Sequence, residues 1–262
     1  MTNQQILAIA LRQSAVDMNC EPGDFLLSEN KIVYSAAREG ARAYLRLPFA
    51  CNLAYYGDNV VASVSPECES AVRAYLAGCG EAFRCFDMPQ VHRLEDALAP
   101  YGLRADVMAR YFLPEVNALQ PLPCPFETRL LGPADFAPLY RPEWPNALSE
   151  DRPHLDVLGV GAYDGGRLIG LAGCSADCAD MWQIGVDVLP DYRRQGVASA
   201  LTSRLALEII ARGKAPFYCA AWSNIRSARN AVRSGFRPAW VEMSFRPSAA
   251  AGIPLAKEAA TP

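Results

Sequence analysis

The sequence is short of long apolar runs, of positive charge and of paired cysteines. No apolar run reaches the roughly 18 residues that a membrane-spanning helix needs. The opening stretch, MTNQQILAIALRQSAVDMNC, has no basic segment ahead of an apolar core, as a secretory signal would have. The net charge of −3 gives no overall positive field that would gather nucleic acid or anionic lipid. These absences favour a cytoplasmic protein that acts on neither membranes nor nucleic acids.

Metal-binding and disulfide patterns are missing as well. The nine cysteines form no CxxC pair, and His92 and His154 are the only histidines. Cys174 and Cys178 have the spacing of half a metal site, but no second pair completes it. A chain of 262 residues builds a core without a disulfide framework. We therefore expect no metal, and we interpret cysteines in apolar runs, such as Cys219, as small buried side chains.

What the second half of the chain does contain is a regular alternation of strand and helix patterns. Asp164-Gly165-Gly166 lies between two apolar runs and predicts a hairpin. Leu201, Leu205 and Ile209 recur on one face of a predicted helix. Strands are expected at 126–131, 158–164, 167–176, 181–189, 216–222 and 239–247, and helices at 197–213 and 224–236. The three consecutive strands before the first of these helices predict an antiparallel meander.

The first half has the same mixture, so the predicted fold class is α/β throughout. Helices are expected at 3–18, 66–80 and 91–102, and strands at 31–37 and within 52–64. The Pro-rich stretch 117–127 is a candidate linker. It separates an N-terminal α/β domain at 1–120 from a second domain at 126–247, which a flexible tail at 248–262 follows. Segment 60–78 has the same order of strand, proline and helix as segment 185–203. This similarity is either a diverged internal duplication or a coincidence, and the sequence leaves both explanations open.

The stretch VLPDYRRQGVASALTSRL (188–205) carries the clearest functional signal. Arg193 and Arg194 follow the end of a strand, and a helical pattern begins directly after Gly196. The first N–H groups of a helix have no internal partner and carry partial positive charge, which suits phosphate. Gly196 has no Cβ and lets a ligand approach the backbone. The pattern predicts a phosphate or pyrophosphate cradle, although an ordinary loop without a ligand can have the same sequence pattern. The stretch lacks the spaced glycines of a P-loop or of a dinucleotide-binding fold.

Two motifs in register resemble the GNAT superfamily of acyl-CoA-dependent N-acetyltransferases. Arg193-x-x-Gly196-x-Ala198 matches the signature Q/R-x-x-G-x-G/A. WSNIRSARNAVRSGF resembles the second family helix, with Asn224, Ser227 and the pair Gly235-Phe236 in register. The resemblance covers about residues 126–247. It implies a mixed, mostly antiparallel sheet flanked by helices, and the N-terminal α/β domain would then be a degenerate GNAT-like half.

The resemblance also implies acetyl-CoA as co-substrate. Its pyrophosphate would lie on the cradle, and its pantetheine arm would pair with the strand ending at 188, which splays from strand 216–222 in the family. The implied contacts are Arg193, Arg194, Gln195, Gly196, Val197, Ala198 and Ser199 in the cradle, Val186, Asp187 and Val188 on the strand, and Asn224 and Ser227 beside the arm.

Acetyl transfer by direct attack needs a neutral amine, an oxyanion donor and a proton for the leaving thiolate. Asp187 is the candidate base, unless it points away and pairs with an arginine; Gln183, where the family often has glutamate, cannot take a proton. The family's tyrosine acid is replaced by Ala231. Ser227 and Asn230 are then the candidates near the sulfur, and Tyr218 and His154 are further ones.

The predicted activity is therefore N-acetylation of a primary amine of a small molecule. A homodimer is a possible oligomeric state. A catalytically weak acyl-CoA sensor, which Ala231 and Gln183 favour, and a protein acetyltransferase are the alternatives. Segment 13–25, with Asp17, Asn19, Cys20 and Asp24, is either an ordinary helix end and turn or part of the acceptor pocket.

Overall fold

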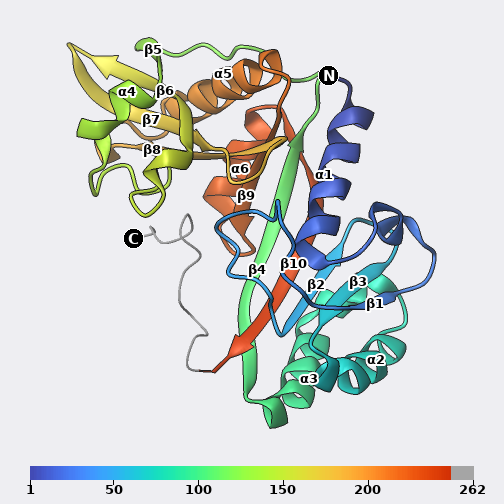
Figure 1. Ribbon diagram of the computed structural model, residues 1–262. Coiled ribbons are helices and arrows are strands. Elements are labelled where there is room, and N and C mark those ends of the chain that lie inside the picture. Colours follow the sequence, from blue (N-terminus) through green and yellow to red (C-terminus); the bar gives the residue numbers. More distant parts are fainter. Residues whose placement is uncertain (249–262) are drawn as a thin grey trace. The chain divides into compact units, whose positions relative to one another are not determined.

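The computed structural model describes residues 1–248, so the predicted tail lies outside the described residues except for Ser248. The strands have the order β1-β3-β2-β10-β4-β9-β8-β7-β6-β5 (Figure 1). Pairing is antiparallel except between β1 and β3 and between β8 and β9, among the pairs with a defined register. The predicted α/β class with a mixed, mostly antiparallel sheet is confirmed.

The chain forms two compact units. The C-terminal unit comprises residues 1–9 and 112–238, and the N-terminal unit comprises residues 10–111 and 239–248 of the described chain. The elements α1 (Asn3–Met18), β4 (Leu103–Pro114) and β10 (Phe236–Pro247) have residues in both units. The predicted boundary near residues 120–126 stays a prediction.

In the C-terminal unit, three antiparallel strands lead to the predicted cradle. Gly165 and Gly166 make the hairpin between the first two strands of this meander, with φ of 54° and 86° that suit glycine. The predicted hairpin and meander are confirmed. The elements of this unit are β5 (Glu127–Leu131), α4 (Pro133–Phe136), β6 (Asp156–Asp164), β7 (Arg167–Ser175), β8 (Met181–Val188), α5 (Val197–Ala211), β9 (Ala215–Ala221) and α6 (Ile225–Arg233).

The two faces of this meander are covered differently (Figure 1). On one face, Val197, Leu201 and Leu205 of α5 pack on alternate residues of β6, β7 and β8. On the other, Phe136 and Trp144 from α4 and the loop after it pack on Leu171. The central strand β7 is thus buried on both sides along most of its length, which explains why its sequence reads as a continuous apolar run.

In the N-terminal unit, α1 covers one sheet face, and α2 and α3 cover the other. Leu53, Ala62 and Val64 pack against α2 and α3, whereas Ala54 and Val61 pack against α1. This alternation is the period of two that a strand imposes. The elements are β1 (Lys31–Tyr34), β2 (Cys51–Tyr55), β3 (Val60–Val64), α2 (Glu69–Gly78) and α3 (Met88–Leu98).

The cysteines are free thiols, and seven of the nine are buried. Cys219 is only partly buried, so its interpretation as a buried side chain is wrong. It lies on the face of β9 opposite to the buried Tyr218. Across residues 1–248, no cluster of three or more His, Cys, Asp or Glu side chains is arranged to hold a metal. Within the same residues, no helix combines the length and the apolar character that a membrane crossing requires.

Candidate functional site

The predicted cradle is the loop between β8 and α5. A 3₁₀ turn at Pro190–Tyr192 follows the strand, and two residues then adopt left-handed backbone angles: Arg194 with φ of 61° and Gly196 with φ of 85°. A non-glycine residue in this region is uncommon. Such alternation turns successive N–H groups to the same side, which makes an anion-binding concavity.

The backbone N–H groups of residues 194–199 in this loop have no acceptor among the described residues. Ala200 donates to Gly196 O at 3.0 Å as the first hydrogen bond of α5. Among the hydrogen bonds of the described residues, none is donated by the backbone N–H groups of residues 194–199. Six consecutive donors at a helix N-terminus, next to the exposed Arg193 and Arg194, form a site for an anion.

The cradle side chains hold the loop in shape. Arg193 Nε donates to Val188 O at 3.0 Å, and Gln195 Nε2 donates to Asp191 O at 3.1 Å. Ser199 Oγ donates to Gly196 O at 3.0 Å. These bonds satisfy carbonyl groups around the turn and leave its N–H groups for a ligand.

Next to the cradle, β8 and β9 pair over only part of their length. Their parallel register ends at Ile184 and Tyr218, whereas β8 continues to Val188. Leu189 N–H donates to Ile169 O at 2.9 Å, toward β7. Because backbone groups alternate along a strand, those of Val186 and Val188 face the β9 side, beyond the paired part. The splay that the sequence resemblance implies is therefore present.

Tyr218 lies where this pairing ends, and its hydroxyl reaches α6. Its Oη lies 2.9 Å from Ser227 Oγ, within hydrogen-bond distance. Burial raises the pKa of Tyr218, while hydrogen bonds with Ser227 and Asn230 oppose that shift. The hydroxyl thus stays protonated at neutral pH. Ala231 is fully buried in the same apolar cluster.

Asn224 and Ser227 are brought together by the start of α6. Asn224 is the N-cap, and its Oδ1 accepts a hydrogen bond from Ser227 N at 3.1 Å. Asn230 Nδ2 donates to Thr202 Oγ1 at 3.1 Å, which ties α6 to α5. Each of these candidates has an internal role, and contact of Asn224 and Ser227 with a cofactor stays a prediction.

Asp187 anchors a loop on the face of β8 away from α5. Its carboxylate accepts hydrogen bonds from Asn146 N (2.8 Å), Asn146 Nδ2 (2.7 Å) and Ala147 N (2.9 Å). Burial raises the pKa of Asp187, and these bonds oppose the shift. The partners are therefore amides and not the arginine considered in the sequence analysis. Because this carboxylate is already engaged, it is poorly placed to act as a base.

The same loop depends on two glycines that the sequence analysis did not use. Gly173 and Gly185 are paired across β7 and β8. A Cβ on Gly185 would lie 1.7 Å from Asn146 O, and one on Gly173 would lie 2.1 Å from Ala147 O. A glycine inside a strand pattern is the available signal for such a close approach.

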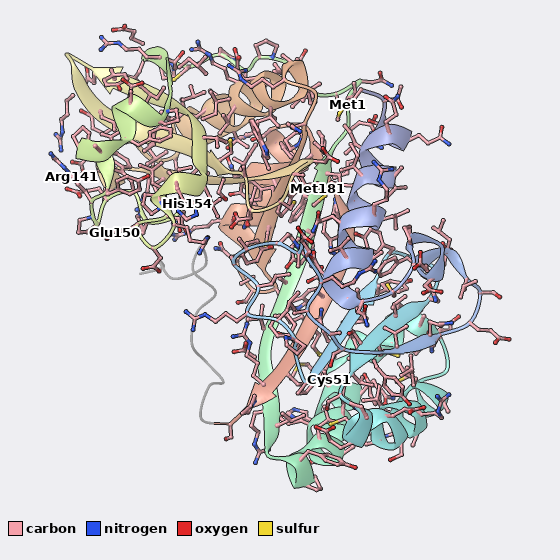
Figure 2. All side chains as sticks on the ribbon, viewed as in Figure 1. Met1, Cys51, Arg141, Glu150, His154 and Met181 are labelled. Carbon is pink, nitrogen blue, oxygen red and sulfur yellow. The ribbon has the colours of Figure 1, made fainter. Side chains whose placement is uncertain are left out.

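Two other candidates have clear positions. Gln183 is buried in β8, and its Oε1 has no hydrogen-bond partner in the described chain. His154 is exposed in a 3₁₀ turn (Figure 2). An unpaired buried acceptor in the strand that leads to the cradle is a candidate contact for a substrate N–H.

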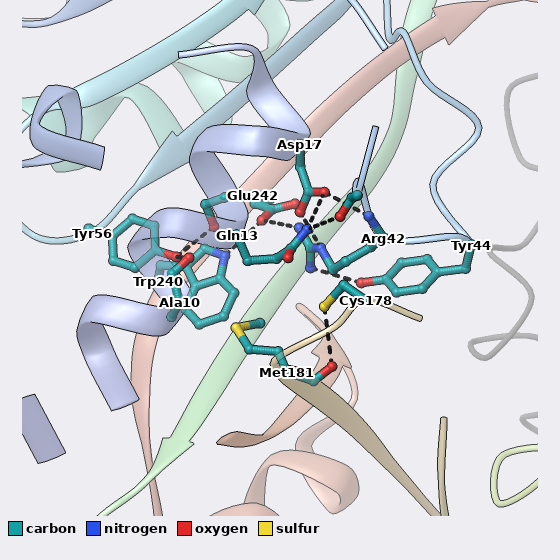
Figure 3. Close-up of polar contacts among 12 residues, drawn as sticks. Ala10, Gln13, Asp17, Arg42, Tyr44, Tyr56, Cys178, Met181, Trp240 and Glu242 are labelled. Carbon is teal, nitrogen blue, oxygen red and sulfur yellow. Dashed lines mark hydrogen bonds and ion pairs between the residues drawn. The ribbon is translucent and has the colours of Figure 1, made fainter. Parts of the chain in front are cut away.

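In the N-terminal unit, segment 13–25 contributes a buried charge cluster. Arg42 Nε lies 2.5 Å from Asp17 Oδ2, and Arg42 Nη2 lies 3.0 Å from Glu242 Oε1 (Figure 3). Trp240 Nε1 donates to Glu242 Oε1 at 2.7 Å, and Arg42 Nη1 donates to Tyr44 Oη at 2.8 Å. Burial raises the pKa of Asp17, an effect that Arg42 opposes.

The other members of that segment are structural. Asn19, with φ of 56°, ends α1 and donates from Nδ2 to Tyr34 O at 3.0 Å. Cys20 is buried, and Asp24 Oδ2 accepts from Glu21 N at 3.0 Å within a turn. Of the four residues, Asp17 also lines a narrow cleft with Asn52 and Ser63.

Comparison with known proteins agrees with these features. The model of the GNAT acetyltransferase family matches residues 155–239. The chain carries a GNAT acetyltransferase segment. This segment includes the cradle, the splayed strands and α6. None of the curated proteins matches the chain.

Among the solved structures that resemble this chain, one has a TM-score of 0.50 and supports a GNAT-like fold. A GCN5-related N-acetyltransferase from Sphaerobacter thermophilus is 17% identical, with 97% of this chain and 95% of that chain covered and a TM-score of 0.50. A GCN5-related N-acetyltransferase-like protein from Streptococcus suis is 23% identical (60% and 68% covered, TM-score 0.45). A GCN5-related N-acetyltransferase from Kribbella flavida is 17% identical, and the match spans 57% of this chain and 62% of that chain, with a TM-score of 0.44.

Proposed function

We propose that this chain is an N-acetyltransferase that moves an acetyl group from acetyl-CoA to a primary amine of a small molecule by direct attack. The observation that carries the proposal is the row of six unpaired N–H groups at residues 194–199, directly beside the unpaired end of β8. A pyrophosphate needs several converging donors, and a polar strand edge suits an amide-containing arm.

Both backbone groups and side chains of this chain are proposed to bind acetyl-CoA. The N–H groups of residues 194–199 hold the pyrophosphate, and Arg193 and Arg194 add positive charge at the rim. Val186 and Val188 offer backbone groups to the pantetheine arm, and the Val188 amide polarises the carbonyl. When bound, acetyl-CoA supplies a thioester carbonyl that an amine can attack.

Tyr218 is the proposed proton donor to the thiolate, and Gln183 is proposed to orient the attacking amine. Tyr218, hydrogen-bonded to Ser227 and kept protonated by burial, holds the proton that the leaving thiolate needs. Gln183 Oε1 accepts a hydrogen bond from the amine and orients it, but it cannot take the proton. Because Asp187 is engaged with Asn146 and Ala147, the proton of the attacking amine passes to water.

A second candidate function is an acyl-CoA-binding module without turnover. The lack of a free carboxylate on β8 favours it, since Asp187 is engaged and position 183 is an amide. Both functions require the cradle, and they differ in whether an amine is acetylated.

Calorimetric titration of the purified chain with acetyl-CoA, CoA and a nicotinamide dinucleotide tests the cradle. Micromolar binding of the CoA compounds alone supports it, and no binding by a folded sample refutes it. A screen of small amines for CoA release then separates the candidates. Turnover with any amine supports the transferase, and tight binding without turnover supports the binding module.

A further inference from the structure

The outer side of α6, labelled in Figure 1, is basic and aliphatic. Its three arginines, Arg226, Arg229 and Arg233, are exposed, and the helix contains no acidic residue. Ile225 and Val232 are 51% and 57% exposed. At about 3.6 residues per turn, these five positions share roughly one third of the helix circumference. We call these five residues the basic face of α6.

The residues that tie α6 to the rest of its unit lie outside this face. Ser227 Oγ lies within hydrogen-bond distance of Tyr218 Oη, and Asn230 Nδ2 donates to Thr202 Oγ1. Ala231 is fully buried. Neither the packing of α6 nor the candidate contacts with the cofactor therefore account for the basic face.

The arginines of the basic face make no internal pairs. No ion pair or hydrogen bond within the described chain engages their guanidinium groups. By contrast, Arg73 of α2 pairs with Glu69 at 2.6 Å, and Arg212 at the end of α5 pairs with Glu208 at 2.7 Å, each one turn away. In α6 the arginines lie one turn from each other instead, and like charges at this spacing repel.

The basic face also works against the stability of its own helix. Arg226 lies in the first turn, where the positive end of the helix disfavours a cation. Ile225 and Val232 are β-branched, and at exposed positions they gain little burial to offset their modest helix propensity. Residues that break local rules without an internal gain are expected at functional sites. The face is therefore explained by a contact from outside the described chain.

We propose that the basic face of α6 docks an acidic amphipathic segment of a partner protein. Ile225, Arg229 and Val232 have the i, i+4, i+7 spacing by which a helix presents anchors to a partner. Aliphatic side chains of the partner cover Ile225 and Val232. Carboxylates of the partner pair with the guanidinium forks, whose geometry suits them.

The charge distribution favours an acidic protein over other polyanions. The chain has a net charge of −3, so the three unpaired arginines are a local feature and not part of a general positive surface that would hold nucleic acid or anionic lipid. Aliphatic side chains between the arginines give nucleic acid bases no stacking surface. Trp222, which is 45% exposed just before the helix, could supply one, so the test includes a nucleic acid.

The test measures fluorescence anisotropy of a labelled probe with the full chain, without CoA. The probe is a short helical peptide with leucine on one side and glutamate on the flanks. The controls are the same peptide with glutamine in place of glutamate, and an oligothymidylate of equal charge. We expect saturable binding of the acidic peptide alone, weakened by salt. Equal binding of either control, or no binding of the acidic peptide by folded protein, overturns the proposal.

Arg229→Glu tests the charge at the centre of the face. We expect peptide binding to fall at least about tenfold, because like charges then meet in the complex. Tm should not fall, since the substitution relieves repulsion with Arg226 and Arg233. Unchanged binding overturns the proposal. A lower Tm does so as well, because it would give Arg229 a structural role.

Arg12→Glu is the matched control. Arg12 is exposed on α1, it makes no ion pair within the described chain, and its substitution changes the net charge by the same amount. We expect this variant to bind the acidic peptide as the parent does. A loss equal to that of Arg229→Glu would show a general charge effect, and would count against the proposal.

Ile225→Ser tests the aliphatic part of the face. Ile225 is half exposed, so the fold loses little, whereas the complex loses an apolar side chain from its interface. We expect binding of the acidic peptide to fall about tenfold. Unchanged binding would mean that only charge is recognised, and would overturn the amphipathic partner.

The inference does not rest on the proposed function, and a repeat of the titration with saturating CoA keeps the two apart. Because Ser227, the candidate cofactor contact, lies outside the basic face, we expect the same affinity for the acidic peptide with and without CoA. An affinity that falls when CoA is added would assign the arginines to the cofactor, and would overturn the proposal.

Discussion

Replacing Gly196 with valine tests the cradle with little disturbance of the fold. A Cβ at this position would meet no atom within 4 Å, so the substitution causes no steric clash. Its cost to the fold comes from holding a residue with a side chain at φ of 85°, which glycine adopts easily. Holding an L-residue in this region costs about 1–2 kcal/mol. For a chain of this size, that lowers Tm by roughly 2–8 °C.

The expected effect on CoA binding is much larger. The side chain occupies the open space in front of the N–H groups of residues 194–199, where the pyrophosphate is proposed to lie. Losing two hydrogen bonds to a charged group, at about 1.5–3 kcal/mol each, weakens binding by about 3–6 kcal/mol. That corresponds to a dissociation constant raised about 150-fold to 20,000-fold.

Calorimetry with CoA measures the change, and Gly213→Val is its control. Gly213 follows the other end of α5, has φ of 73° and also has no atom near a Cβ. It should lose the same stability and keep its affinity for CoA. The reasoning is refuted if Gly196→Val binds CoA within threefold of the parent, or if Gly213→Val loses as much affinity.

Three other substitutions give distinct results. Tyr218→Phe should lower kcat about 100-fold and leave KM for acetyl-CoA nearly unchanged, measured as CoA release with an amine found by screening; an unchanged kcat would exclude the hydroxyl as the acid. Asp187→Ala should lower the free energy of unfolding in urea by about 2–4 kcal/mol, because Asn146 and Ala147 lose their acceptor. Because burial raises the pKa of Asp187, the folded chain binds the Asp187 carboxyl proton more tightly than the unfolded chain does. The free energy of unfolding of the parent should therefore fall as pH rises just above the ordinary aspartate pKa. If the free energy of unfolding of Asp187→Ala falls with the same slope over this pH range, this reasoning is contradicted. Arg42→Met should cost about 3–5 kcal/mol in urea unfolding, since two buried carboxylates lose their partner, and a loss below about 1 kcal/mol would contradict the ion network.

The features that the sequence predicted correctly have local causes. The hairpin at Gly165-Gly166 and the start of α5 after Gly196 each depend on residues within one turn of each other. For the same reason the free donors of residues 194–199 follow from the sequence, since a helix beginning after a glycine leaves its first N–H groups unpaired.

The features that were missed depend on distant partners. The strand β4 was not predicted; it begins with charged residues, and one of them, Asp106, is buried against Arg246 from β10. Asp187 looks like a free carboxylate in its strand because its amide donors, Asn146 and Ala147, come from a Pro-rich loop about 40 positions earlier. The family resemblance implied that β8 and β9 splay, but the residue at which their pairing ends, Tyr218, does not show in the sequence, since β9 is apolar on both sides of that point.

The pairing of β10 with β2 has a consequence for synthesis on the ribosome. Residues 239–248, which complete the N-terminal unit, leave the ribosome only after residues 112–238. Until then Cys51–Tyr55, which is buried in the finished unit apart from Tyr55, is an unprotected strand edge. Domains usually fold in the order in which they are made, but here the N-terminal unit, most of which is made before residue 112, is completed last. A fragment that stops before β10 is therefore expected to aggregate, and the N-terminal unit can be produced alone only if residues 239–248 are supplied, in trans or by circular permutation.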